Sequence, residues 1–305
     1  MKNKKVCIIV VTFNPQIENF ENNLQMFLEN DSYKIILVDN FSNNIKQIRQ
    51  SVILNKEYII LNELDSNYGI AHAQNKGINI AKNLDCTHVL FFDQDSCVPS
   101  NTLQELLSQE LKILSQGINL GAIGPIYKDS RTNNFYPLGL IKGINLKKIY
   151  PEVNSNLNYE TSFIISSGTL IQINIFDKVG LMNTNLFIDI VDIEWCLRAS
   201  HFGYKIFATS SVILNHSIGD KRIISFGKEI SIHSPIRRYY MVRNALLITR
   251  FKWVPLGYKL RIIFGTILRS LRFIYALNFN FIYIKHIVWG LRDGLFNISG
   301  KFNKL

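Results

Sequence analysis

Two carboxylates separated by one residue offer the clearest chemistry in this chain. Asp93 ends the apolar run THVLFFD (87–93), which predicts a buried strand, and Asp95 lies two residues further on. A hard divalent cation such as Mg²⁺ or Mn²⁺ binds one or two protein carboxylates and completes its shell with phosphate oxygens and water. The spacing fits such a site, and it also fits a solvated loop that caps a helix beginning near Pro99.

Polar clusters also follow three other predicted strands. They are Thr12-Phe13-Asn14, Val38-Asp39-Asn40-Phe41-Ser42 and Asn67-Tyr68-Gly69. Polar residues after a strand commonly form turns, so each cluster alone is a weak signal. In open α/β sheets, however, ligands bind beyond the carboxyl ends of the strands. The four clusters together therefore predict one binding site at one edge of a sheet.

Acidic residues gather again before Trp195 and Arg198. They are Asp189, Asp192 and Glu194. If 190–202 is a helix, Asp192 and Trp195 share a face, whereas Glu194 points roughly 160° away from Asp192 at 3.6 residues per turn. Asp192 and Glu194 are thus not expected to act as a pair. Acidic residues also favour the first turn of any helix, which is the alternative explanation.

Short apolar runs alternate with helical patterns in the first half of the chain. The predicted strands are 6–13, 34–39, 57–62, 87–93 and 120–125, and the helices run from Asn14-Pro15 to about Glu29, over 43–51, from Ile70 and from Pro99. This alternation predicts an α/β fold with a mainly parallel, doubly wound sheet. We expect an irregular surface excursion over 126–162, then strand character over 162–173, a helix over 190–202 and strands over 204–215.

Charge divides the 305 residues unevenly. The formal net charge is +11, but residues 221–305 carry +14 and residues 1–220 carry −3. No phosphate-binding loop or dinucleotide fingerprint is present, and the N-terminal apolar run is too short for a secretory signal. Cys7 and Cys86 lie in apolar runs and are expected to be buried free thiols in a reducing cytoplasm. The slightly acidic body argues against nucleic-acid binding.

The basic segment is also rich in large apolar residues. Over Phe251–Lys304 these are Trp253, Phe264, Phe273, Tyr275, Phe279, Phe281, Tyr283 and Trp289, beside Lys252, Lys259, Arg261, Arg269, Arg272 and Lys285. Basic and aromatic residues together suit amphipathic helices lying on an anionic membrane surface. Core helices or a homo-oligomer contact would use the same apolar faces. We place a boundary near 235, with a basic helical extension over 235–305.

Eight segments, in order, carry a family resemblance. They are VVTFNP (10–15), ILVDNFS (36–42), NYGIAHAQNKGI (67–78), FFDQDS (91–96), SSGTLI (166–171), FIDIVDIEWCLRA (187–199), LNHSIG (214–219) and SPIRRYYMVRN (234–244). The chain resembles the family 2 glycosyltransferases of GT-A fold, and among them the bacterial rhamnosyltransferases. The resemblance implies a Rossmann-like, mainly parallel mixed sheet over 1–234, with a nucleotide-binding half over 1–125 and an acceptor half over 126–234.

The resemblance also assigns site residues on the donor side. It implies that Asp39 accepts a hydrogen bond from the N3–H of a uracil or thymine ring, and that Asp93 faces the ribose. Asp95 and His216 would hold Mg²⁺ or Mn²⁺ on the diphosphate. The other residues implied to contact the nucleotide sugar are Thr12, Asn14, Asn67, Gly69, Asn75 and Arg243.

On the acceptor side, the resemblance places the general base at Asp192, beside Trp195 and Glu194. Many relatives have an acidic residue just before the base, and Val191 stands there instead. Asp189 and Glu194 therefore remain alternatives for the base. Arg237 and Arg238 would either neutralise the leaving diphosphate, serve the acceptor or form plain ion pairs.

The implied activity is inverting transfer of L-rhamnose from dTDP-L-rhamnose to a hydroxyl of a lipid-linked glycan or polysaccharide. The enzyme would work at the cytoplasmic face of the cell membrane in cell-surface polysaccharide synthesis. The residues do not separate rhamnose from galactofuranose or a UDP-hexose. A non-catalytic nucleotide- or glycan-binding relative and a nucleotidyltransferase are the alternatives from other classes.

Overall fold

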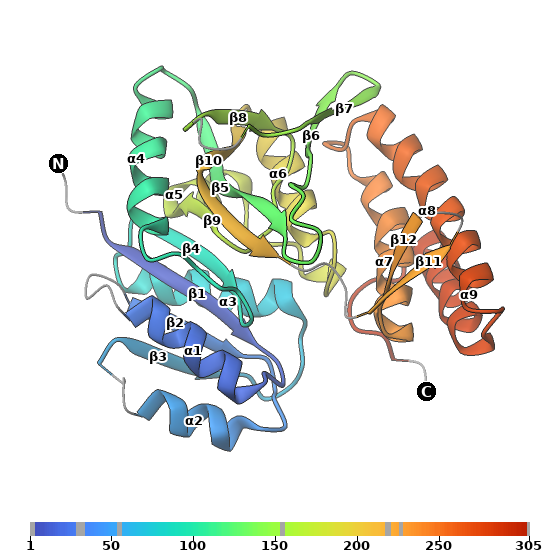
Figure 1. The fold of residues 1–305 in the computed structure, drawn as a ribbon, viewed down its shortest axis with the longest axis horizontal. Coiled ribbons are helices and arrows are strands. Elements are labelled where there is room, and N and C mark those ends of the chain that lie inside the picture. The colour runs from blue at the N-terminus through green and yellow to red at the C-terminus, as the bar shows by residue number, and fades with distance from the viewer. Residues whose placement is uncertain are drawn as a thin grey trace.

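The computed structural model describes residues 4–28, 34–53, 57–152, 156–216, 221–225 and 228–303. Within these ranges, eight strands form one central sheet (Figure 1). Their order across the sheet is β3 (Ile59–Glu63), β2 (Lys34–Asp39), β1 (Val6–Thr12), β4 (His88–Asp93), β9 (Thr169–Gln172), β5 (Leu120–Asp129), β10 (Lys205–His216) and β8 (Asn158–Thr161).

Most neighbouring strands run parallel. β1 pairs in parallel with β2 and β4, β2 with β3, and β5 with β10, whereas β9 runs antiparallel to β4 and β5 and β8 antiparallel to β10. The predicted mainly parallel mixed sheet is therefore confirmed. Val11 pairs with Asp93, and Thr12 pairs with Asp39. This register brings the polar residues that follow β1, β2 and β4 to one edge.

Helices cover both faces of the sheet (Figure 1). The helices are α1 (Ile17–Leu28), α2 (Ile45–Ile53) and α4 (Thr102–Leu114) on one face, and α3 (Ile70–Asn83), α5 (Ile173–Val179) and α6 (Val191–His201) on the other. Successive side chains of β1 point to opposite faces of the sheet, so Cys7 and Ile9 pack in one core and Ile8 and Val10 pack in the other. Each predicted helix of the first half is present, with its ends shifted by a few residues.

The segment over 126–162 is more ordered than expected. β5 continues to Asp129, and a hairpin of β6 (Leu138–Lys142) and β7 (Asn145–Ile149) follows before β8. The expectation of an irregular excursion is therefore wrong for these strands. β7 reads NLKKI and buries none of its residues, so no buried alternation marks it in the sequence. The strand expected over 162–173 is shorter, because only Thr169–Gln172 is extended in the sheet.

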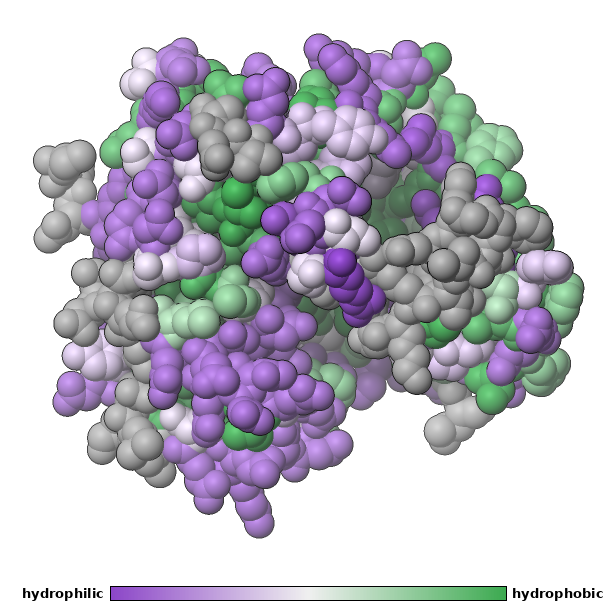
Figure 2. Space-filling view, viewed as in Figure 1, coloured by the Kyte–Doolittle hydropathy of each residue, from purple (hydrophilic) through white to green (hydrophobic). Residues whose placement is uncertain are grey.

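The C-terminal part packs beside the sheet domain (Figure 1). A hairpin of β11 (Lys221–Ser225) and β12 (Lys228–Ile232) precedes α7 (Pro235–Leu247), α8 (Leu256–Ala276) and α9 (Phe281–Leu295). Leu197 of α6 shares a core cluster with Ala245, Ile248 and Ile262. No helix among the described residues has the length and apolar character needed to cross a membrane. In Figure 2, the face near α2 is hydrophilic, and hydrophobic and hydrophilic residues are mixed along the side formed by the C-terminal helices.

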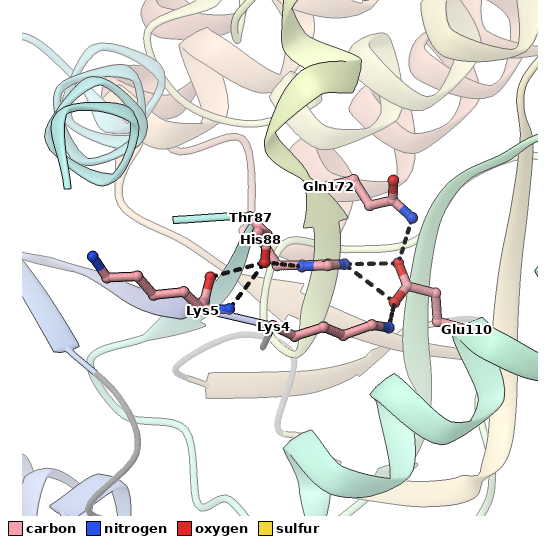
Figure 3. A network of polar contacts seen from close by, with 6 residues as sticks. All are labelled: Lys4, Lys5, Thr87, His88, Glu110 and Gln172. Carbon is pink, nitrogen blue, oxygen red and sulfur yellow. Dashed lines mark hydrogen bonds and ion pairs between the residues drawn. The ribbon is translucent and has the colours of Figure 1, made fainter. Parts of the chain in front are cut away.

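A network of polar contacts lies at the end of the sheet where β4 begins, opposite the edge formed by the ends of β1, β2 and β4. His88 Nε2 lies 3.0 and 3.1 Å from the two Glu110 carboxylate oxygens, and Lys4 and Gln172 donate to the same group at 2.5 and 2.8 Å (Figure 3). The network ties α4 to β4 and β9. Nearby, Cys7 and Cys86 are joined in a disulfide, so the expectation of two free thiols is wrong. β1 and β4 are neighbours, which brings the two thiols together.

Candidate active site

Asp39 lies at the carboxyl end of β2 in a fixed orientation. Its Oδ1 accepts the Thr12 hydroxyl at 2.9 Å and the Ser42 hydroxyl at 2.5 Å, and its Oδ2 accepts the Ser42 backbone N–H at 2.8 Å. Asn14, in the left-handed region with φ 48°, donates its N–H to the Ser42 hydroxyl at 2.8 Å. The ends of β1 and β2 are thereby joined around one buried carboxylate. Asp39 thus both caps the 39–42 turn and presents an acceptor-only group at the sheet edge.

The loop after β3 adds a second set of contacts. Asn40 donates to Asn67 Oδ1 at 2.9 Å, and the same oxygen accepts the Gly69 N–H at 3.0 Å. Gly69 has φ +85°, and a Cβ there would lie 2.4 Å from the Phe187 carbonyl oxygen. Only glycine fits this position without displacing backbone. The close approach links the loop after β3 to the segment before α6.

Asp93 and Asp95 end β4 beside the β1 loop. Gln94, between them, accepts the Phe13 N–H at 2.8 Å and donates to the Phe13 carbonyl at 3.3 Å, so the carboxylates are held in place from β1. Asp95 is exposed. Burial, Asp95 and Asp192 raise the pKa of Asp93 to about 7, against the opposing effect of Arg237. Asp93, Asp95 and Asp192 therefore act on one another electrostatically.

Asp192 projects from the first turn of α6. Its Oδ1 accepts the Ile193 N–H at 2.8 Å, and its Oδ2 accepts the Ser166 N–H at 3.2 Å. Burial raises the pKa of Asp192 to about 6, backbone N–H donors oppose that rise, and Asp189 adds to it. A carboxylate with this pKa is ionised near neutral pH and is basic enough to accept a proton.

Side chains outside the predicted set complete this region. Gln74 of α3 donates to the Ser166 hydroxyl at 2.9 Å. The Tyr127 hydroxyl donates to the Ser167 carbonyl at 2.7 Å, and burial together with Asp93 and Asp192 raises the pKa of Tyr127 well above its usual value. Gln74 and Ser166 both lie within segments that carried the family resemblance, whereas nothing in the sequence marked Tyr127.

A divalent cation fits the acidic residues at the end of β4. Mg²⁺ and Mn²⁺ bind one or two protein carboxylates, and Asp95 is an exposed carboxylate two residues beyond Asp93. Among the described residues no group of three His, Cys, Asp or Glu side chains is placed to hold an ion. His216 ends β10 with its backbone opposite Asp129, and its side chain lies outside what the structure describes. The protein thus offers a partial shell, which suits a cation shared with a diphosphate.

Four residues that the resemblance places at the donor or acceptor side make hydrogen bonds or ion pairs within the protein. The Asn75 amide both donates to and accepts from the Met182 backbone at 2.8 Å. Trp195 is buried and donates to the Gly180 carbonyl at 2.9 Å. Glu194 is buried and pairs with Arg198 at 2.9 Å. These contacts position α3, α5 and α6 relative to one another.

Arg243 is the fourth residue of this group. Its guanidinium is fully buried, donates to the Leu186 and Gly300 carbonyls and lies 4.8 Å from the centre of the Tyr240 ring. Its neighbour Asn244 donates to the carbonyls of Leu186, Ile188 and Asp189 at 2.8, 2.6 and 3.1 Å. α7 thereby holds the segment that leads into α6.

That segment has an unusual backbone. Phe187, Asp189 and Ile190 have φ of 65°, 64° and 66°, a region that bulky residues rarely adopt. Arg237 of α7 pairs with Asp189 at 3.2 Å. Strain of this kind persists only where surrounding contacts impose it, and the bonds from α7 supply them. Asn244 ends the segment 234–244 that carried the family resemblance, but its role could not be predicted, because its partners are carbonyls more than 50 residues away.

Known proteins resemble this chain in sequence and fold. The family model described as glycosyl transferase family 2 matches residues 7–180. The dTDP-rhamnosyl transferase RfbF of Shigella flexneri is 32% identical over 298 residues, covering 98% of both chains.

Solved structures share the fold at low identity. GalNAc-T7 with UDP, GalNAc and Mn²⁺ aligns with a TM-score of 0.58 at 13% identity, over 98% of this chain and 58% of that one. The mannosyltransferase PcManGT from Pyrobaculum calidifontis, in complex with GDP-Man and Mn²⁺, aligns with a TM-score of 0.57 at 14% identity, over 96% and 86%. TarS 1–349 of S. aureus with UDP-GlcNAc gives 0.56 at 16%, over 96% and 81%.

The mixed sheet, the acidic residues at the end of β4 and the sequence matches agree. The chain belongs to glycosyl transferase family 2, has the GT-A fold and is similar to bacterial rhamnosyltransferases.

Proposed function

We propose that the chain transfers L-rhamnose from dTDP-L-rhamnose to a hydroxyl of a lipid-linked glycan, with inversion at the anomeric carbon and with Mg²⁺ or Mn²⁺. The observation that carries the proposal is the placement of acidic residues from two elements in one region: Asp93 ends β4 and Asp95 follows it, and Asp192, in the first turn of α6, is near enough to raise the pKa of Asp93. The rhamnosyl donor follows from the 32% identity to RfbF over almost the whole chain.

Asp192 is the proposed general base. Its carboxylate would accept the proton of the acceptor hydroxyl as that oxygen attacks the anomeric carbon from the face opposite the nucleotide. Bonds from Ser166 and Ile193 fix the orientation of the carboxylate, and Asp189 keeps its basicity high. Glu194 is less suited to this role, because it is fully buried and bonded to Arg198. Asp189 is paired with Arg237.

The donor would lie along the ends of β1, β2 and β4. Asp39 would accept from the base ring, with Thr12, Asn14, Asn67 and Gly69 shaping the nucleoside pocket around it. Asp93 would face the ribose, while Asp95 and His216 would hold the cation. The bound cation would neutralise charge on the departing nucleoside diphosphate. Asn75, Trp195 and Arg243 would hold the surrounding segments in place through their hydrogen bonds within the protein.

The acceptor side is proposed to lie at a membrane surface on the cytoplasmic side of the cell. α8 and α9 expose large apolar side chains, among them Phe264 at 63% and Phe281 at 74%, next to basic residues. A surface of this kind suits the interface of an anionic leaflet.

A panel of nucleotide sugars tests the proposal. The protein is incubated with dTDP-L-rhamnose, UDP-galactofuranose and UDP-hexoses, with Mn²⁺, with Mg²⁺ or with EDTA, and release of the nucleoside diphosphate is measured. We expect release from dTDP-L-rhamnose that stops in EDTA. Release from another donor alone would discard rhamnose, and absence of both release and donor binding would favour a non-catalytic relative.

A further inference from the structure

A cavity of about 470 Å³ lies next to the proposed base. Its walls come from the start of α6, from α7, from α8 and from the β6–β7 hairpin. Asp189, Ile190 and Ile193 line it on the α6 side, so its lining includes the residue directly after Asp192 and the residue two before it. Tyr258 also lines it, and Asp192 contributes to raising the pKa of Tyr258. A group bound there would lie adjacent to the base.

Three guanidinium groups converge on this cavity. Arg238 comes from α7, and Arg261 and Arg269 come from α8. Burial and Arg269 lower the pKa of Arg238 to about 10, and burial and Arg261 lower the pKa of Arg269. The positive charges of Arg238, Arg261 and Arg269 are therefore close enough to disfavour the protonated form of their neighbours.

Among the described residues that line the cavity, Asp189 is the acidic one beside these three arginines. Its Oδ1 accepts from Arg237, its Oδ2 has no hydrogen-bond partner among the described residues, and its charge raises the pKa of Arg238 against the effects of burial and Arg269. Arg238 is 6% exposed and stacks on Phe273 at 3.7 Å, yet its Nε has no hydrogen-bond partner among the described residues. A buried, charged donor without a partner is costly. Its natural complement is an anion with several oxygens, which guanidinium groups bind through paired hydrogen bonds.

The rest of the wall is apolar. Ile193, Val242 and Ile262 line the cavity beside the arginines. An anion alone would leave this apolar surface unused. A diphosphate esterified to a hydrocarbon chain matches both parts of the lining.

We propose that this cavity binds the diphosphate of a lipid-linked acceptor, with Arg238, Arg261 and Arg269 as its ligands and the apolar lining residues Ile193, Val242 and Ile262 beside its hydrocarbon. The inference rests on the proposed function, and it adds an anion site distinct from the donor site at Asp93 and Asp95. The acceptor would be anchored at its diphosphate, with the sugar hydroxyl reaching Asp192.

The test measures binding by calorimetry in EDTA and without donor, so that no cation can recruit a diphosphate to Asp93 and Asp95. The probes are farnesyl diphosphate below its aggregation concentration, farnesol and inorganic pyrophosphate. We expect farnesyl diphosphate to bind more tightly than pyrophosphate, and farnesol to bind far more weakly than either. The double variant Arg261→Gln/Arg269→Gln should weaken farnesyl diphosphate binding by at least about tenfold.

Arg272→Gln is the matched control, because Arg272 is an exposed arginine of α8 outside the lining. It should change the affinity by less than about twofold. Equal losses in the control and the double variant would reduce the effect to general charge attraction and overturn the proposal. Equal affinity for pyrophosphate and farnesyl diphosphate would assign the site to a free anion, and tight binding of farnesol would remove the role of the arginines.

Donor binding separates this proposal from the proposed function. The affinity for dTDP with Mn²⁺ should be unchanged in the double variant. If the wild-type protein binds farnesyl diphosphate as described but no nucleotide sugar, the proposed function fails and the anion site stands. If it transfers rhamnose but binds no farnesyl diphosphate, the anion site fails alone.

Discussion

The backbone N–H of Ser166 donates to Asp192 Oδ2 at 3.2 Å across 26 residues of sequence. Ser166 in turn accepts a hydrogen bond from Gln74 of α3, the helix that follows the proposed nucleotide loop. The proposed base is therefore positioned from the donor side of the sheet as well as from its own helix. Orientation of a catalytic group by such contacts is a large part of enzymatic rate enhancement.

Replacing Asp192 by Asn should separate binding from turnover. The variant keeps the size of the side chain but cannot accept the acceptor proton, so kcat should fall by a factor of about 10² to 10⁴. The Kd for dTDP with Mn²⁺ should stay within about twofold of wild type. Asp177→Asn serves as control, because Asp177 pairs with Lys82 on the surface. Wild-type turnover in Asp192→Asn would remove it as the base.

Replacing Asp95 by Asn should weaken the cation site. Loss of a carboxylate ligand should raise the Mn²⁺ concentration needed for half-maximal release of dTDP by about tenfold or more. Metal titration of donor turnover gives the measurement. An unchanged metal requirement would place the cation elsewhere.

The pH dependence of kcat/KM should show an acidic limb near pH 6. Burial raises the pKa of Asp192 to about 6, so the base is protonated and inactive at pH 5 and ionised at pH 8. Asp189→Asn removes a neighbouring negative charge and should move the limb to lower pH. The profile is recorded at saturating Mn²⁺. A limb that moves to higher pH would contradict the proposed influence of Asp189.

Asn244→Ala should disturb the site from a distance. It removes the donor for three carbonyls between residues 186 and 189, which should cost about 1–3 kcal/mol of stability. We also expect a lower kcat with an unchanged Kd for dTDP, because the segment leads into α6. Thr249→Ala, which removes one local bond to Leu246, should leave kcat unchanged.

Glu110→Gln tests the network at the far end of the sheet. Burial would raise the pKa of Glu110, but His88, Lys4 and Gln172 outweigh it and lower the pKa to about 2. The ionised carboxylate thus contributes stability above pH 4.5, and this contribution is lost as the pH falls towards 2.

The variant should accordingly be less stable than wild type by about 1–3 kcal/mol at pH 7 in urea unfolding, with a smaller difference at pH 3. Glu105→Gln, on the same helix, should have a much smaller effect at both pH values. A difference that is the same at pH 7 and pH 3 would show that the charge of Glu110 does not matter.

Local patterns predicted most of the sheet and the acidic residues of the site. The apolar runs that became β1, β2 and β4 are buried on both faces, so their burial is visible in the sequence itself. Strand β7 of the β6–β7 hairpin was missed because none of its residues is buried, so no buried alternation marks it in the sequence. Trp195 and Arg243 resembled ligand contacts, but their partners are carbonyls brought close only by tertiary packing, and no local pattern encodes such partners.

The hydrogen bonds from Asn244 to the backbone of residues 186–189 limit where this chain can be truncated without loss of stability. A chain ending before Pro235 would keep every strand of the central sheet. The carbonyls of Leu186, Ile188 and Asp189 would nevertheless lose their hydrogen-bond donor, and the left-handed backbone of this segment would lose the bonds that hold it. We therefore expect α7 to be needed for the stability of the segment before α6, whatever the role of the helices that follow it. Minimal catalytic fragments should be designed to extend at least through α7.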